Sequence, residues 1–152
     1  MNSKIWGTYT WIFFHTLAEK IKEEEFENNK SLFINIIIKT CNHLPCPECS
    51  EHATSVLKQA YLNNIKTKKH FIEFLRQFHN IVNIKTNKSE LMRSDIVDMY
   101  KNNNLSIIFI NMVKIYKSIK GSERLMTYNF HRDKFLQELS NDLNRNKHLF
   151  DN

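Results

Sequence analysis

Glycine and proline are so rare in this chain that they strongly limit the folds it can adopt. Only 2 Gly and 2 Pro occur among the 152 residues. All-β proteins need many tight turns, and tight turns favour these two residue types. Gly7 and Gly121 also stand alone, so the chain has no glycine-rich phosphate loop. We therefore predict an all-α fold and exclude P-loop and Rossmann folds.

Length and composition indicate a globular chain. Apolar residues make up 41% and charged residues 25%, which is enough apolar content to bury a core. The length allows one compact domain, or one domain with an appendage. The net charge is +6, and a basic chain can bind nucleic acid. Because the lysines are scattered, we predict no nucleic-acid partner.

The sequence contains no obvious targeting or membrane segment. Its longest apolar stretches, 32–38 and 105–110, fall far short of the roughly 20 residues that span a bilayer. The first residues lead into an aromatic helix pattern without a signal-peptide core. We therefore expect no membrane partner and a cytoplasmic location, where structural disulfides are unusual. Three cysteines in such a chain point to catalysis or metal binding.

Apolar residues recur at helical spacing along most of the chain. The pattern predicts helices around 11–18, 31–41, 47–61 and 71–82, and a short helix ending near 100. A strand is the alternative for 31–41, which is rich in β-branched isoleucine. The charged segment 20–30 is expected to be a helix end and loop. Ser89 or Ser94 is the expected cap of the short helix.

A polar segment, Lys101–Asn104, is the best candidate for a domain boundary. Beyond it, the spacing predicts helices over 105–120 and 130–149, with Gly121 ending the first of them. We therefore expect two parts: a domain over residues 1–102 and a C-terminal helical extension over residues 103–152.

The sharpest local motif is a cysteine pair at a predicted helix start. Cys46 and Cys49 are separated by two residues, and Pro45 and Pro47 flank Cys46. Such a pair can close a small disulfide ring. A helix N-terminus stabilises a thiolate and lowers the pKa of whichever cysteine points into it. This chemistry suits thiol–disulfide exchange.

The same segment also offers zinc ligands. Cys41, His43, Cys46, Cys49 and His52 lie within twelve residues, and four of them can form a tetrahedral site. A CxxC pair alone does not decide between redox chemistry and metal binding. A zinc-stabilised helical binding module, and a helical interaction protein with inert cysteines, therefore remain alternatives.

Two further motifs combine rings and amides. Trp11 and His15 lie four residues apart on one predicted helix face, and His79 and Asn83 do so on another. Each pair alone is more often part of a core. Together they offer the flat aromatic surface and hydrogen-bonding groups that suit a large planar heterocycle with a polar tail.

In their order and spacing, these motifs resemble the Erv/ALR family of FAD-linked sulfhydryl oxidases. The motifs are W-x3-H-x2-A from Trp11, C-x2-C-x2-H from Cys46, and H-N-x-V-N from His79. The opening Lys4-Ile5-Trp6-Gly7 is similar to the versions encoded by large DNA viruses. The resemblance implies a fold of four bundled helices plus a short fifth helix, and this fold would bind FAD. It covers residues 4 to about 100.

The resemblance also implies roles for individual residues. Cys46 and Cys49 would be the catalytic pair, with Cys46 meeting the substrate and Cys49 facing the flavin. No metal is expected. The implied FAD-binding residues are Trp6, Gly7, Trp11, His15, Cys49, His52, His79, Asn80, Val82, Asn83, Lys85 and Lys88.

By the same resemblance, the enzyme is a flavin-linked thiol oxidase. The substrate would be a protein dithiol or a thioredoxin-like protein, and O2 would accept the electrons and give hydrogen peroxide. Phenylalanines on the first two helices predict a homodimer. A viral origin would place the enzyme in the host cytosol or the virus factory, and packaging in the virion would also be compatible.

The chain departs from the family pattern in three places. It has no cysteine after Cys49 and therefore no shuttle pair. Cys41 is the only spare cysteine, expected to be buried and inert, with an intermolecular bond as the alternative. Ser89 follows Lys88 where the family often has proline. We therefore expect substrate thiols to reach Cys46 directly or through a separate thioredoxin-like partner.

Overall fold

The computed structural model describes residues 3–152, with side chains from residue 5 onward. Met1, Asn2 and the Lys4 side chain of the opening motif lie outside the described residues. The helices are α1 (Ser3–Lys20), α2 (Glu23–Cys41), α3 (Pro47–Gln59), α4 (Lys68–Lys85), α5 (Arg93–Met99), α6 (Leu105–Ser118) and α7 (Met126–Arg145). Short 3-10 turns span Leu62–Asn64, Glu123–Leu125 and Lys147–Leu149.

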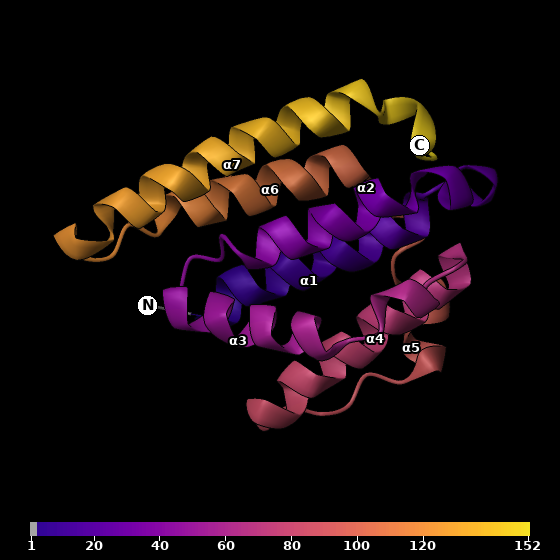
Figure 1. Ribbon diagram of the computed structural model, residues 1–152, viewed down its shortest axis with the longest axis horizontal. Coiled ribbons are helices and arrows are strands. Elements are labelled where there is room, and N and C mark those ends of the chain that lie inside the picture. Colours follow the sequence, from indigo (N-terminus) through magenta and orange to yellow (C-terminus); the bar gives the residue numbers. More distant parts are fainter. Residues whose placement is uncertain (1–2) are drawn as a thin grey trace.

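Helices α1 to α4 form a bundle, and α5 is a short fifth helix beside α4 (Figure 1). Residues 3–152 contain no strand, only an isolated bridge between Ile21 and Phe150. The predicted all-α fold is therefore confirmed. The strand alternative for 31–41 is not observed, because this segment forms the second half of α2.

Helix α1 lies in the middle of the molecule. It packs against α4 on one side and against α6 on the other (Figure 1). As a result, every residue from Phe13 to Ala18 is buried, including His15 and Thr16. A helix that is covered on all sides must be apolar around most of its circumference, which explains the aromatic run in this segment.

Helix α2 begins earlier than the sequence predicts. Segment 20–30 was expected to be a helix end and loop, but α2 already starts at Glu23. Glu23, Glu24 and Glu25 occupy its first turn, where negative charge interacts favourably with the helix dipole. Phe26 is fully buried and anchors this turn in the core. The charged residues that predicted a loop therefore mark the start of a helix.

The short helix α5 also begins differently from the prediction. Neither Ser89 nor Ser94 caps it, because the residue before its first turn is Met92. The carboxylate of Asp95 accepts a hydrogen bond from the Met92 amide at 2.9 Å instead. Asn104 caps α6 by accepting from the Ile107 amide at 3.1 Å.

The C-terminal helices share one core with the bundle. Phe109 on α6 contacts Phe13 on α1 with 5.5 Å between ring centroids, and Tyr116 lies edge-on to Trp6 at 6.4 Å. The apolar residues of α7 that join this core are Phe135, Leu136 and Leu139. Residues 103–152 therefore cover α1, and they reach α2 through the ring contact between Phe33 and Phe150. Helix α6 ends at Ser118, and Gly121 follows with a left-handed φ of 64°.

The phenylalanines that led us to predict a homodimer lie inside this chain. Phe13, Phe14, Phe26 and Phe33 are all almost completely buried. They provide no apolar surface for a second copy. Among residues 3–152, no helix combines the length and the apolar character that a membrane span requires.

Candidate active site

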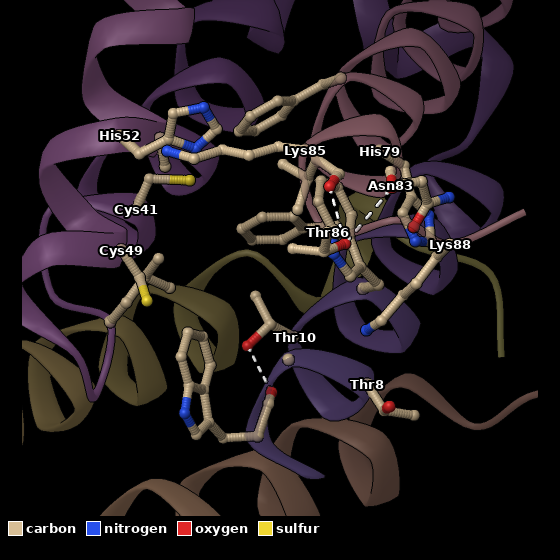
Figure 2. A pocket seen from close by; sticks show the side chains of 18 of the residues that line it. Thr8, Thr10, Cys41, Cys49, His52, His79, Asn83, Lys85, Thr86 and Lys88 are labelled. Atoms are coloured by element: carbon tan, nitrogen blue, oxygen red, sulfur yellow. Dashed lines mark hydrogen bonds between the residues drawn. The ribbon is translucent and has the colours of Figure 1, made fainter. Parts of the chain in front are cut away.

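A cavity of about 480 Å3 is lined mainly by α1, α3 and α4 (Figure 2). Its volume is typical of a site for a small molecule or cofactor. The predicted FAD-binding residues that line it are Trp6, Gly7, Trp11, Cys49, His52, His79, Val82, Asn83, Lys85 and Lys88. The fold thus brings together residues from three separate sequence motifs.

Stacked rings form one wall of this cavity. The rings of Trp11 and His79 are nearly parallel, with centroids 4.1 Å apart. His15 stacks behind them, 5.1 Å from His79 and 5.0 Å from Tyr100. Because these rings come from α1, α4 and the end of α5, the wall also joins three helices. Flat aromatic surface of this kind suits a planar ligand.

Two lysines give the cavity positive charge at separate places. Lys85 is close enough to Cys49 and His52 to act on both: its charge opposes the raised pKa of Cys49, and together with burial, the larger cause, it lowers the pKa of His52. Lys88 lowers the pKa of His79, although burial of that imidazole is the larger cause. Figure 2 shows Cys49 and His52 on one side of the cavity, and His79 and Lys88 on the other. An anionic ligand would therefore meet a cation near each end.

The cysteine pair lies at the start of α3. Pro47 occupies the first turn, where its missing N–H leaves no hydrogen bond unmade. Cys46 is the N-cap residue, and its Sγ accepts a hydrogen bond from the Cys49 amide at 3.3 Å. Both cysteines are free thiols and partly exposed. Cys49 lines the cavity, whereas Cys46 does not.

The electrostatics of Cys49 differ from the expectation for a thiol that points into the helix N-terminus. Burial, a hydrogen bond with Cys46 and the charges of Cys46 and Glu48 raise the pKa of Cys49 to about 12. Lys85 opposes this shift. The sequence left open which sulfur meets the helix N-terminus. In the structure it is the Cys46 sulfur, and burial dominates at Cys49.

Two residues predicted to bind FAD are not in the cavity wall. His15 lies behind it, and its Nε2 is 2.9 Å from Nδ1 of His79. The Asn80 side chain points to the α4–α5 connection, where it donates to the Leu91 carbonyl at 2.9 Å and accepts from the Leu91 amide at 2.7 Å. His15 therefore supports His79 in the wall, whereas Asn80 holds the α4–α5 connection, and neither residue lines the cavity.

The structure also adds lining residues that the motifs did not contain. Tyr100 follows α5, and Thr86 lies at the end of α4. Thr10, on α1, hydrogen-bonds the Trp6 carbonyl at 2.8 Å and also bonds the hydroxyl of Tyr116. The spacing of Thr10 from Trp6 was a visible signal, because the two lie four residues apart on one helix. Tyr100 had no local signal.

Trp6 and Gly7 leave unfilled positions on the cavity surface. The Trp6 indole N–H is buried and has no hydrogen-bond partner among the described residues, although buried donors are nearly always paired. A Cβ atom built on Gly7 would have no atom within 4 Å. The cavity therefore offers an unused donor and open room beside α1.

The residues proposed as zinc ligands do not converge. Within residues 3–152, no group of three or more His, Cys, Asp or Glu side chains is placed to hold a metal ion. His43 instead stacks on Phe135 with 4.5 Å between centroids and donates to the Lys39 carbonyl. Cys41 is buried, and its pKa is strongly raised by that burial.

Fold and site together define a helical bundle with a dithiol beside an aromatic, cationic cavity. Residues 8–102 match the Erv1/Alr family, and the chain belongs to this family. The resemblance drawn from the three motifs is thereby confirmed. The matched region ends at residue 102, the boundary that the sequence predicts for the C-terminal extension.

Two viral proteins are similar to this chain. A protein of invertebrate iridescent virus 3 that carries the name of an FAD-linked sulfhydryl oxidase is 26% identical over 102 residues, covering 66% of this chain and 69% of its own. A fowlpox virus protein with the same kind of name is 29% identical over 86 residues, covering 54% of this chain and 83% of its own.

Proposed function

We propose that this chain is an FAD-dependent thiol oxidase that forms disulfides in protein substrates through Cys46 and Cys49. Family membership and the names of both viral relatives support a flavin-linked sulfhydryl oxidase. The observation that carries the proposal is the placement of the pair. Cys49 lines the cavity that contains the family motifs, whereas Cys46 lies outside it and is partly exposed.

The cavity fits FAD in its chemistry. The stacked rings of Trp11 and His79 suit its planar ring systems, and the positive charge of Lys85 and Lys88 suits an anionic dinucleotide. The unpaired Trp6 N–H can donate to a ring acceptor, and the space beside Gly7 permits close approach. His52, Val82 and Asn83 complete the proposed binding residues, while His15 and Asn80 position His79 and the α4–α5 connection.

The protein's own chemistry is thiol–disulfide exchange. A substrate thiolate attacks the Cys46 sulfur of the Cys46–Cys49 disulfide, the S–S bond breaks, and Cys49 leaves as a thiolate. A second substrate thiol then attacks the substrate sulfur of the mixed disulfide. The substrate leaves as a disulfide, and its two electrons and two protons stay with the cysteine pair.

FAD, when bound, supplies a two-electron acceptor that O2 can reoxidise, with hydrogen peroxide as the product. Lys85 favours the charged form of Cys49, because its ammonium lowers the pKa of that thiol. The thiolate is the reactive form of a cysteine. Lys85 therefore favours electron transfer from the Cys49 thiolate to an acceptor that would bind in the cavity.

The remaining elements of the proposal concern organisation and partners. We assign FAD binding to residues 1–102 and cover of α1 and α2 to residues 103–152. The expected substrate is a protein dithiol or a thioredoxin-like protein in the cytoplasm. A homodimer stays a prediction. The apolar surface that could form such a dimer includes Ile107 and Ile110 on α6, which are about half exposed. Light scattering of the purified chain measures the oligomeric state.

Substitution of Cys49 tests the proposed function. The purified chain should be yellow with bound FAD and should consume O2 when a dithiol is added. Cys49→Ser should keep the FAD and lose this consumption. Cys41→Ala is the control. Cys41 also lines the cavity, but its buried thiol is not one of the two sulfurs of the exchanging pair, so this variant should keep most of the activity. Full activity of Cys49→Ser, or colourless protein with stoichiometric zinc, would overturn the proposal.

A further inference from the structure

The C-terminal helix α7 reaches the segment that carries the cysteine pair. The hydroxyl of Tyr128 lies 2.6 Å from the Leu44 carbonyl oxygen and 2.9 Å from Oγ of Ser50. Ser50 Oγ is also 3.0 Å from the Leu44 amide nitrogen. Tyr128 lies outside the region that matches the family, which ends at residue 102. This contact therefore belongs to the extension of this chain.

The directions of the three hydrogen bonds follow from proton counting. A carbonyl can only accept, so the single Tyr128 proton goes to Leu44. The Ser50 hydroxyl must then donate to the Tyr128 oxygen, and it accepts from the Leu44 amide. Each of the three groups donates once and accepts once, which closes a ring. Hydrogen bonds arranged in this way strengthen one another.

This ring of hydrogen bonds joins the two ends of the redox segment. Residues 44–50 contain both Cys46 and Cys49, and Leu44 and Ser50 are its two ends. Inside the segment, the Ser50 amide donates to the Cys46 carbonyl at 3.0 Å, and the Cys49 amide donates to the Cys46 sulfur at 3.3 Å. Leu44 and Ser50 are both buried. Tyr128 thus ties together the two ends of the segment that carries the sulfurs.

The phenol of Tyr128 also interacts electrostatically with Cys46 and Cys49. Burial is the main cause that raises its pKa, and both Cys46 and Cys49 add to the increase. The hydroxyl therefore lies within electrostatic reach of both sulfurs, in agreement with the hydrogen-bond geometry.

We propose that Tyr128 is a positioning residue for the redox pair: by closing residues 44–50 into a ring, it fixes Cys46 relative to Cys49. A disulfide is more stable when its two thiols are held close together in the dithiol state, because less entropy is lost on ring closure. Loosening the ring should therefore make the Cys46–Cys49 disulfide easier to reduce. The consequence for turnover, but not for this equilibrium, depends on the proposed oxidase function.

The direct test is the Tyr128→Phe variant of the full chain with its FAD. The pair is equilibrated without oxygen in mixtures of oxidised and reduced dithiothreitol, quenched, alkylated and counted by mass. We expect the equilibrium constant for disulfide formation to fall three- to tenfold, and tenfold corresponds to about 30 mV for a two-electron couple. Tyr61→Phe is the control, because Tyr61 is 83% exposed. A Tyr128→Phe constant within twofold of the wild-type constant would overturn the proposal.

A second variant approaches the same ring from α3. Ser50→Ala removes the Ser50 hydroxyl and should also lower the equilibrium constant for disulfide formation. This variant keeps the proposal testable if Tyr128→Phe fails to fold. The double variant should show less than the sum of the two effects, because both changes break one ring. Full additivity would contradict the shared mechanism.

Turnover separates this proposal from the proposed function. With dithiothreitol as substrate, Tyr128→Phe should lower kcat severalfold and change KM less than twofold, while bound FAD stays at the wild-type level. If the equilibrium constant shifts but no form of the chain consumes O2, the oxidase proposal fails and the positioning role stands.

Discussion

His15 and His79 share a hydrogen bond across the bundle, with 2.9 Å between Nε2 of His15 and Nδ1 of His79. One nitrogen must donate and the other accept, so the accepting imidazole must be neutral and the two rings cannot both be protonated while the bond lasts. Burial is the main cause that lowers the pKa of His15 to about 3 and that of His79 to about 4. The pair therefore resists protonation in the folded chain.

This pair makes folding stability sensitive to mild acid. Above pH 6.5 both histidines are neutral in the folded and the unfolded chain, so they cause no pH dependence. Below pH 6.5 the unfolded chain binds protons that the folded chain cannot, and stability should fall by roughly 1 kcal/mol per pH unit for each histidine until the folded pKa values of about 3 and 4 are approached. Thermal unfolding between pH 7 and pH 5 measures this slope.

His15→Gln should show a shallower slope than the wild-type chain, whereas the exposed His148→Gln should keep the wild-type slope. Equal slopes for wild type and His15→Gln would show that the buried pair does not control the acid response.

Gly7 tests where the ligand approaches α1. Its position inside a helix costs stability relative to alanine, and an added Cβ meets no atom within 4 Å. Gly7→Ala should therefore raise the free energy of unfolding by about 0.5–1 kcal/mol without FAD, but should weaken FAD binding severalfold. Titration with FAD and chemical unfolding measure the two effects.

Asn35→Ala on the exposed face of α2 is the control, since it improves helix propensity far from the cavity. If Gly7→Ala stabilises the chain and leaves FAD affinity unchanged, FAD does not approach this part of α1.

Asn80 is expected to act through the α4–α5 connection. Asn80→Ala removes both hydrogen bonds to Leu91 and should destabilise the chain by about 1–3 kcal/mol. It should also speed hydrogen exchange in residues 86–92 and release FAD faster, because Lys88 lies in this connection. Lys69→Ala, on an exposed position of the same helix, serves as the control. Unchanged hydrogen exchange in residues 86–92 would show that Asn80 does not hold the α4–α5 connection in place.

The C-terminal extension should contribute strongly to stability. Phe109 is 7% exposed and packs against Phe13, so Phe109→Ala should lower the free energy of unfolding by about 3–5 kcal/mol. The neighbouring Ile110 is 50% exposed, and Ile110→Ala should cost far less. Urea unfolding compares the two. Similar small losses would mean that α6 packs only loosely on α1.

Local patterns were sufficient to predict most helices, but their ends were less predictable. The spacing of apolar residues gave the second half of α2, and Pro47 marked the start of α3, because these signals act within one or two helical turns. The first half of α2 was missed because Glu23 and its acidic neighbours favour either a solvated loop or a helix start. The buried position of Phe26 decides between them, and burial depends on distant residues.

By itself, the sequence determined the helical class, the family motifs and the cysteine pair, since each depends on residue types at fixed short spacings. Only the tertiary structure decided that the Cys46 sulfur meets the start of α3, that Asn80 holds Leu91, and that Tyr128 reaches the redox segment. The last contact joins residues 84 positions apart. Contacts at such separations arise from the packing of whole helices, which no local spacing specifies.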